Sequence, residues 1–128
     1  MAIKVGDIVR YNGKEQRVMG ISSRAGNTVF SLSHEGNGSK IRASEVTLVE
    51  SFTKPDIKTG DFIHILPAPP EERDFYVDAN KPIDDDIYEV IDVWETSRSA
   101  TVIDIIYRGH KRHYMAHYVE KVREYDMI

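Results

Sequence analysis

The chain has 128 residues, of which 41% are hydrophobic and 30% charged, and it contains no cysteine. This is enough for one domain, or two very small ones, with buried cores. The lack of cysteine excludes disulfides, thiolate metal sites and cysteine nucleophiles. The net charge of −4 argues against wrapping nucleic acid by bulk charge alone. No stretch resembles a signal peptide or a membrane span, so we expect a cytoplasmic protein.

The first third of the chain reads as short strands joined by tight turns. "DIVRY" (7–11) and "KEQRVMGIS" (14–22) flank an Asn-Gly pair, the dipeptide that favours a two-residue hairpin turn. "NTVFSLS" (27–33) and "SKIRA" (39–43) flank a glycine-containing turn. After them, Ser44 is expected to cap a single helical turn before a closing strand, "VTLV".

The same order of segments then occurs a second time. "IKVGDIVRY" at 3–11 returns as "IKTGDFIHI" at 57–65, and residues 28–49 align without a gap against residues 101–122. Such self-similarity indicates an internal duplication. The aligned blocks share six identities: Thr28, Val29, Gly36, Ala43, Val46 and Val49 match Thr101, Val102, Gly109, Ala116, Val119 and Val122.

We therefore predict an all-β protein made of two tandem five-stranded small barrels, residues 1–52 and 53–128. Pro55 suits the boundary because proline cannot donate to a strand ladder. The second copy carries 18 additional residues after its first strand, in a loop at about 66–86. Two separate cores are expected, one from Ile8, Val18, Ile21, Phe30, Leu32, Ile41, Val46 and Leu48, the other from Ile63, Val90, Val93, Ile103, Ile105 and Val119.

The motifs IKVGD and IKTGD, with the strand order, resemble the Src-homology-3-like small barrels, including the KOW and Tudor types. The chain is also similar to small barrel proteins encoded by tailed phages, which would place it in the host cytoplasm. Within the motif, Gly6 and Gly60 are expected to let the backbone enter the first strand. Asp7 and Asp61 are expected to accept hydrogen bonds from nearby backbone N–H groups.

The inserted loop and the residues that follow it carry a strong excess of negative charge. Between residues 71 and 95 there are ten acidic and two basic residues, whereas residues 1–55 have eight basic and five acidic residues. The resemblance implies that a long acidic loop at this position recognises basic peptides. The residues expected to bind a protein partner are Glu71, Glu72, Asp74, Asp84, Asp85 and Asp86, with Tyr88 and Trp94 as aromatic neighbours. The alternative is a solvated polar loop.

The stretch "YRGHKRHYMAHYVEKV" (107–122) is rich in histidine, tyrosine and basic residues. His110, His113 and His117 have helical spacing, but the repeat places them on a turn, a strand and a cap, so no metal site is predicted. The stretch is either a solvated hairpin tip or a nucleic-acid contact that combines cations with aromatic rings. The second interpretation uses Arg108, His110, Lys111, Arg112, His113 and Tyr114.

No segment sets a nucleophile beside a base, and no glycine-rich phosphate loop is present, so we expect neither catalysis nor a cofactor. The leading hypothesis is a binding or adaptor protein that recognises a basic protein surface through the acidic loop. The alternative is a nucleic-acid-binding protein that uses the basic first copy and the turn at 107–118. The oligomeric state does not follow from the sequence.

Overall fold

The computed structural model describes residues 2–36, 38–66 and 87–122, and within these ranges the chain is all-β, as predicted. The strands pair antiparallel, and two single turns of 3₁₀ helix interrupt them in the described residues. No helix in these ranges is long and apolar enough to cross a membrane. The chain forms two compact units, Met1–Thr53 with Glu95–Ala100, and Lys54–Trp94 with Thr101–Ile128.

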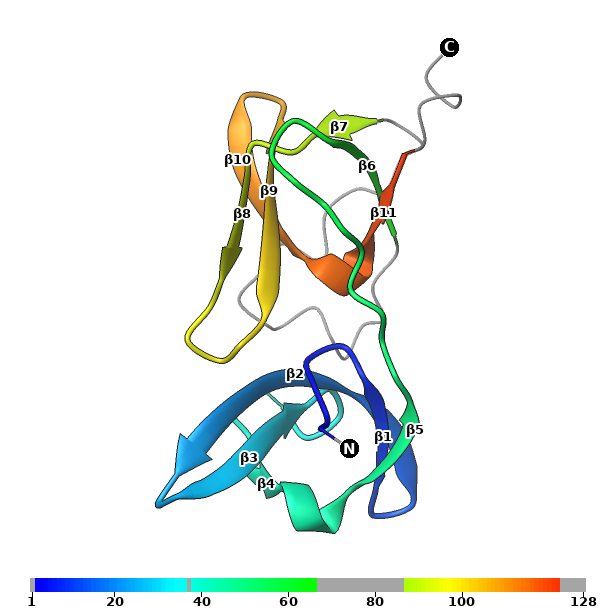
Figure 1. Ribbon diagram of the computed structural model, residues 1–128, viewed down its shortest axis with the longest axis vertical. Coiled ribbons are helices and arrows are strands. Elements are labelled where there is room, and N and C mark those ends of the chain that lie inside the picture. The colour runs from blue at the N-terminus through cyan, green and yellow to red at the C-terminus, as the bar shows by residue number, and fades with distance from the viewer. Residues whose placement is uncertain (1, 37, 67–86, 123–128) are drawn as a thin grey trace. The chain divides into compact units, whose positions relative to one another are not determined.

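The first unit contains one five-stranded sheet in the order β4-β3-β2-β1-β5 (Figure 1). Two tight turns join its first three strands, and all four turn residues have positive φ angles: Asn12 and Gly13, then Ala25 and Gly26. Two-residue turns with positive φ angles have a twist that matches the twist of the paired strands, and this explains why hairpins form here. The strands are β1 (Ile8–Tyr11), β2 (Lys14–Arg24), β3 (Asn27–Leu32), β4 (Ile41–Arg42) and β5 (Thr47–Glu50).

The described residues of the second unit form two three-stranded sheets, in the orders β10-β9-β8 and β11-β6-β7. The β9–β10 hairpin turns at Arg108 and Gly109, both with positive φ. The hydrogen bonding of the described strands closes neither unit into a ring. The strands are β6 (Phe62–Ile65), β7 (Tyr88–Glu89), β8 (Asp92–Glu95), β9 (Thr101–Tyr107), β10 (His110–Met115) and β11 (Val119–Lys121).

The two units share their local structure at aligned positions. Gly6 and Gly60 have φ angles of 98° and 95°, and their N–H groups donate to the carbonyls of Val18 and Val90, both at 2.8 Å. The aligned 3₁₀ turns, η1 (Ala43–Glu45) and η3 (Ala116–Tyr118), are each flanked by extended residues. Ser44 lies inside η1 instead of capping it, because the extended residue that precedes the turn is Arg42.

The predicted cores form two separate clusters. The first contains Val9, Val18, Phe30 and Leu32, with Ile21, Ile41, Val46 and Leu48 packed against it. The prediction of Ile8 was wrong: Ile8 is half-buried, and Val9 is fully buried in its place. Val9 and Tyr11 are two positions apart on β1, so they lie on the same side of the strand, toward the core, and Ile8 lies on the other side. The second cluster contains Ile57, Ile63, Ile65, Val90, Ile103, Ile105, Tyr114 and Val119.

A candidate anion-binding face on the first unit

Strands β2, β3 and β4 present a row of basic residues on the side of the sheet opposite the core. Arg24 pairs with Asn27, and Val29 pairs with Arg42, so these four side chains point to one side. Lys40, two residues before Arg42, joins them. The alternate residues of the same strands, including Phe30, pack into the first core. We call Arg24, Asn27, Val29, Lys40 and Arg42 the basic face.

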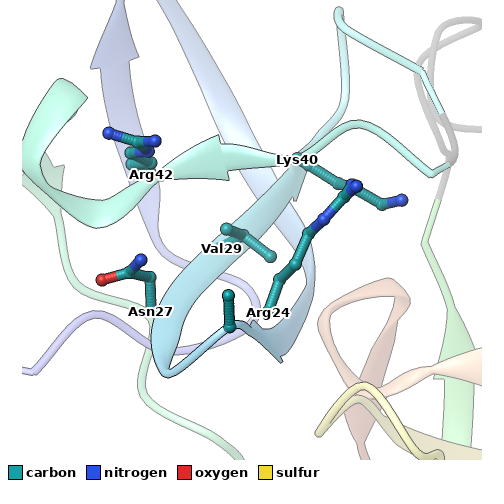
Figure 2. Close-up of a pocket in the computed structure, with 6 residues that line it drawn as sticks. Arg24, Asn27, Val29, Lys40 and Arg42 are labelled. Atoms are coloured by element: carbon teal, nitrogen blue, oxygen red, sulfur yellow. The ribbon is translucent and has the colours of Figure 1, made fainter.

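The basic face surrounds a pocket of about 260 Å³ that also touches Ala25. Figure 2 shows Val29 at its floor, with the long Arg24 and Lys40 side chains beside it and Arg42 on the neighbouring strand. Val29 is only 5% exposed, whereas the three basic residues are exposed. Long basic side chains can cover apolar surface with their stems and keep their charged ends in water. The pocket therefore has an apolar floor and a cationic rim.

Among the described residues, no carboxylate lines this pocket to neutralise its positive charge. Elsewhere in the first unit, Lys4 pairs with Asp7 and Arg10 pairs with Glu15. In the described part of the chain, the side chains of Arg24, Lys40 and Arg42 form no ion pair. The carboxylate of Glu45 accepts a hydrogen bond from the backbone N–H of Arg42 at 2.9 Å, not from its guanidinium group. Like charges gathered without a counter-charge favour an anionic ligand.

A fourth cation borders the basic face. Residues 95–100 belong to the first unit, and the carbonyl of Arg98 accepts the N–H of Ile21 at 2.8 Å. The guanidinium of Arg98 donates to the hydroxyl of Ser31, two residues along β3 from Val29, at 3.3 Å. A Cβ atom on Gly20 would lie 3.2 Å from the Cβ of Arg98, a tight contact that glycine avoids.

The second unit has a different polar cluster, centred on a buried carboxylate. Asp104 is 3% exposed, and its Oδ1 lies 2.9 Å from Nε1 of Trp94 and 2.6 Å from Nδ1 of His113. His113 is the cross-strand partner of Asp104, and Trp94 comes from β8. The Trp94 and His113 rings meet edge to face, with centroids 6.0 Å apart. We call these three residues the tryptophan cluster.

The residues predicted to bind a protein partner are only partly within the described ranges. Glu71, Glu72, Asp74, Asp84, Asp85 and Asp86 lie outside them. Tyr88 is half-buried against the second core, and its ring centroid lies 5.9 Å from that of Tyr107. Trp94 remains 38% exposed. The structure thus joins Trp94 to His113 and Asp104.

The residues predicted to contact nucleic acid from 107–118 do not share one surface. Tyr114 is 1% exposed and belongs to the second core, so its ring is not available for stacking on a base. The reason is the alternation of β10, which turns Tyr114 inward and His113 outward. His110 and Lys111 are exposed, and Arg108 lies 5.2 Å over the Tyr107 ring.

We expect added zinc to leave the melting temperature unchanged, because the three histidines do not converge. His110 and His113 are three positions apart on one strand and so point to opposite sides. His113 is bound to Asp104, and His117 lies in η3 against Tyr118. A metal stabilises a protein only if its ligands converge in the folded state. A rise in melting temperature with zinc that His113→Ala abolishes would contradict this.

The composition of the first copy showed an excess of basic residues, but it did not show which of them form a site. The available signal was the alternation in "SKIRA", which sets Lys40 and Arg42 on one side of a strand. Asp104 was missed because it lies in the apolar run "TVIDIIY". Comparisons with protein-family models, curated proteins and solved structures gave no match.

Proposed function

We propose that the chain is a non-enzymatic binding protein whose first unit binds nucleic acid through its sugar–phosphate backbone. One observation carries this proposal: three exposed basic side chains, Arg24, Lys40 and Arg42, line one pocket, and no carboxylate of the described residues lines it. Phosphate contacts supply most of the non-specific affinity for nucleic acid, because bound cations release counterions from the polymer. The amide of Asn27 adds a hydrogen-bond donor of the kind found at phosphates.

The chemistry of the basic face favours backbone contacts over base contacts. No aromatic side chain lines the described pocket, so it lacks the stacking platform that single-strand binders use. The cations lie on a sheet surface, without the helix that commonly enters a major groove. We therefore expect binding with little preference for base sequence.

The proposal also includes two Src-homology-3-like small barrels that arose by duplication. The matched glycine turns at Gly6 and Gly60 and the matched 3₁₀ turns before the last strands support it. The five-stranded sheet of the first unit, bent around one core cluster, has the strand number expected of such a barrel.

Reversing two charges of the basic face is expected to weaken binding at least about tenfold and to lower the salt slope by about two. The variant is Arg24→Glu with Lys40→Glu, measured by fluorescence anisotropy with labelled single and double strands at low salt. The matched control is Lys14→Glu with Lys54→Glu, two exposed lysines outside the pocket, which changes the net charge equally.

The control variant should retain most of the affinity, because its residues do not line the pocket. Equal losses in both variants would show that bulk charge alone is responsible and would overturn the assignment of the basic face. Absence of binding by the unmodified protein at low salt would overturn the function itself.

A further inference from the structure

The tryptophan cluster lies on the part of the second unit that corresponds to the basic face of the first. The ungapped block matches Ser31 with Asp104 and Lys40 with His113. In the strands that precede this block, Val18 corresponds to Val90. Ser22, four residues after Val18, therefore corresponds to Trp94, four residues after Val90. The ends of the two hairpins support this alignment. Arg24 pairs with Asn27 at the end of the first hairpin, and the N–H of Thr96 donates to the carbonyl of Ala100 at the end of the second. The remaining matches are Gly20 with Asp92, Arg24 with Thr96, and Arg42 with Met115.

Electric charge is inverted between these corresponding surfaces. Lys40 and Arg42 of the basic face are matched by His113 and by Met115, which is buried, and Arg24 is matched by the uncharged Thr96, which belongs to the first unit. Two uncharged positions, Gly20 and Ser31, have become Asp92 and Asp104. This surface therefore cannot repeat the anion binding of the first unit, and its carboxylates attract cations instead.

Trp94 is suited to contact a ligand because it is exposed and already fixed. Its side chain is 38% exposed, yet its Nε1–H is held by the buried Asp104. Holding an aromatic ring in place before binding reduces the entropy lost when the ligand arrives. Asp92, two residues before Trp94 on β8, points to the same side and is exposed. On β10, the exposed cation nearest to His113 in the sequence is Lys111, two residues away.

We propose that Trp94, with Asp92 beside it, binds an arginine or lysine side chain of a cationic protein segment. A cation placed over an indole ring is attracted by its π-electrons, and tryptophan is the strongest such partner. Tryptophan and arginine are also the residues most enriched at the energetic centres of protein interfaces. The exposed Asp92 carboxylate supplies the charge complementarity, and Asp104 with His113 positions the ring. The duplicated surface thus carries opposite preferences in the two units.

Trp94 is the chain's only tryptophan, so its fluorescence reports directly on this surface. We expect an octa-arginine peptide to change the emission in a saturable manner and an octa-glutamate peptide to leave it unchanged. Asp92→Asn should weaken peptide binding about threefold, and Trp94→Ala, followed with a labelled peptide, about tenfold. The matched control is Asp56→Asn, which neutralises another exposed carboxylate of the second unit.

An unchanged emission spectrum with octa-arginine would overturn the proposal. So would equal weakening by Asp92→Asn and Asp56→Asn, because the peptide would then follow the general negative charge. Asp92 is exposed, so its variant tests the proposal even if Trp94→Ala fails to fold. The variant Arg24→Glu with Lys40→Glu should leave peptide binding intact, which separates this inference from the nucleic-acid function.

Discussion

Replacing Asp7 with asparagine is expected to lower the free energy of unfolding of the first unit by about 3 kcal/mol at neutral pH. The Asp7 side chain is fully buried. Its oxygens accept the backbone N–H groups of Lys4 at 3.0 Å and Phe52 at 2.7 Å, and the Lys4 ammonium at 3.0 Å. Asparagine would remove the charge and turn an NH₂ group toward groups that are themselves donors. Calorimetry at pH 7 measures the loss.

This stabilisation by Asp7 should disappear in acid. Burial raises the pKa of the carboxyl group, but the hydrogen bonds from Lys4 and Phe52 and the Lys4 charge outweigh burial and leave the pKa below the ordinary 3.8. A lowered pKa means that the stabilisation is fully present above pH 3.8 and is lost as the pH falls through the folded-state value. The difference between the unmodified protein and Asp7→Asn should therefore narrow below pH 3.8.

The second copy supplies the control for Asp7. Asp61 occupies the aligned position and accepts the N–H of Lys58 at 2.9 Å, but its side chain is 26% exposed. The Lys58 N–H and the Lys121 ammonium, 3.2 Å away, lower the pKa of Asp61 as well. Because water can replace these partners, Asp61→Asn should cost clearly less stability than Asp7→Asn. Equal losses would show that burial is not the cause.

The short strands and the matched turns of the two copies were predictable because their signals are local. Tight turns need residues such as Asn12 and Gly13, and the repeat shows itself by direct alignment. The phase of a short strand is less certain, since one position shifts every side chain to the other side. The sequence repeat already indicated that Val9, and not Ile8, belongs to the core. Ile63, which was correctly predicted to be a core residue, aligns with Val9.

The candidate sites were harder to predict because they form across strands. Trp94 and His113 had been assigned to different ligands, yet both bind Asp104 from neighbouring strands. The basic face likewise joins Arg24 to Lys40 and Arg42, which lie at least 16 positions away in the sequence. Composition located the positive charge in the first copy, but only the pairing of β2, β3 and β4 brings it to one pocket.

Gly6→Ala is expected to destabilise the first unit by about 2 to 5 kcal/mol, and two separate costs contribute. The φ angle of 98° is one that side chains rarely adopt, which costs about 1 to 2 kcal/mol. A Cβ atom would also lie 2.5 Å from Cδ2 of Phe52, so the ring must shift. Such overpacking typically costs about 1 to 3 kcal/mol. The melting temperature of the first unit, followed by calorimetry, measures the sum.

Gly60 separates the two costs, because it has nearly the same φ angle but a Cβ atom at this position would have no neighbour within 4 Å among the described residues. Gly60→Ala should therefore show the backbone cost alone, and its difference from Gly6→Ala should equal the steric cost. Phe52→Ala tests that assignment in a double-mutant cycle, since removal of the ring should take away most of the extra cost of Gly6→Ala, while the Cβ atom of residue 52 remains 3.1 Å away. If the cycle shows no coupling between Gly6 and Phe52, the additional cost of Gly6→Ala has a cause other than contact with the Phe52 ring.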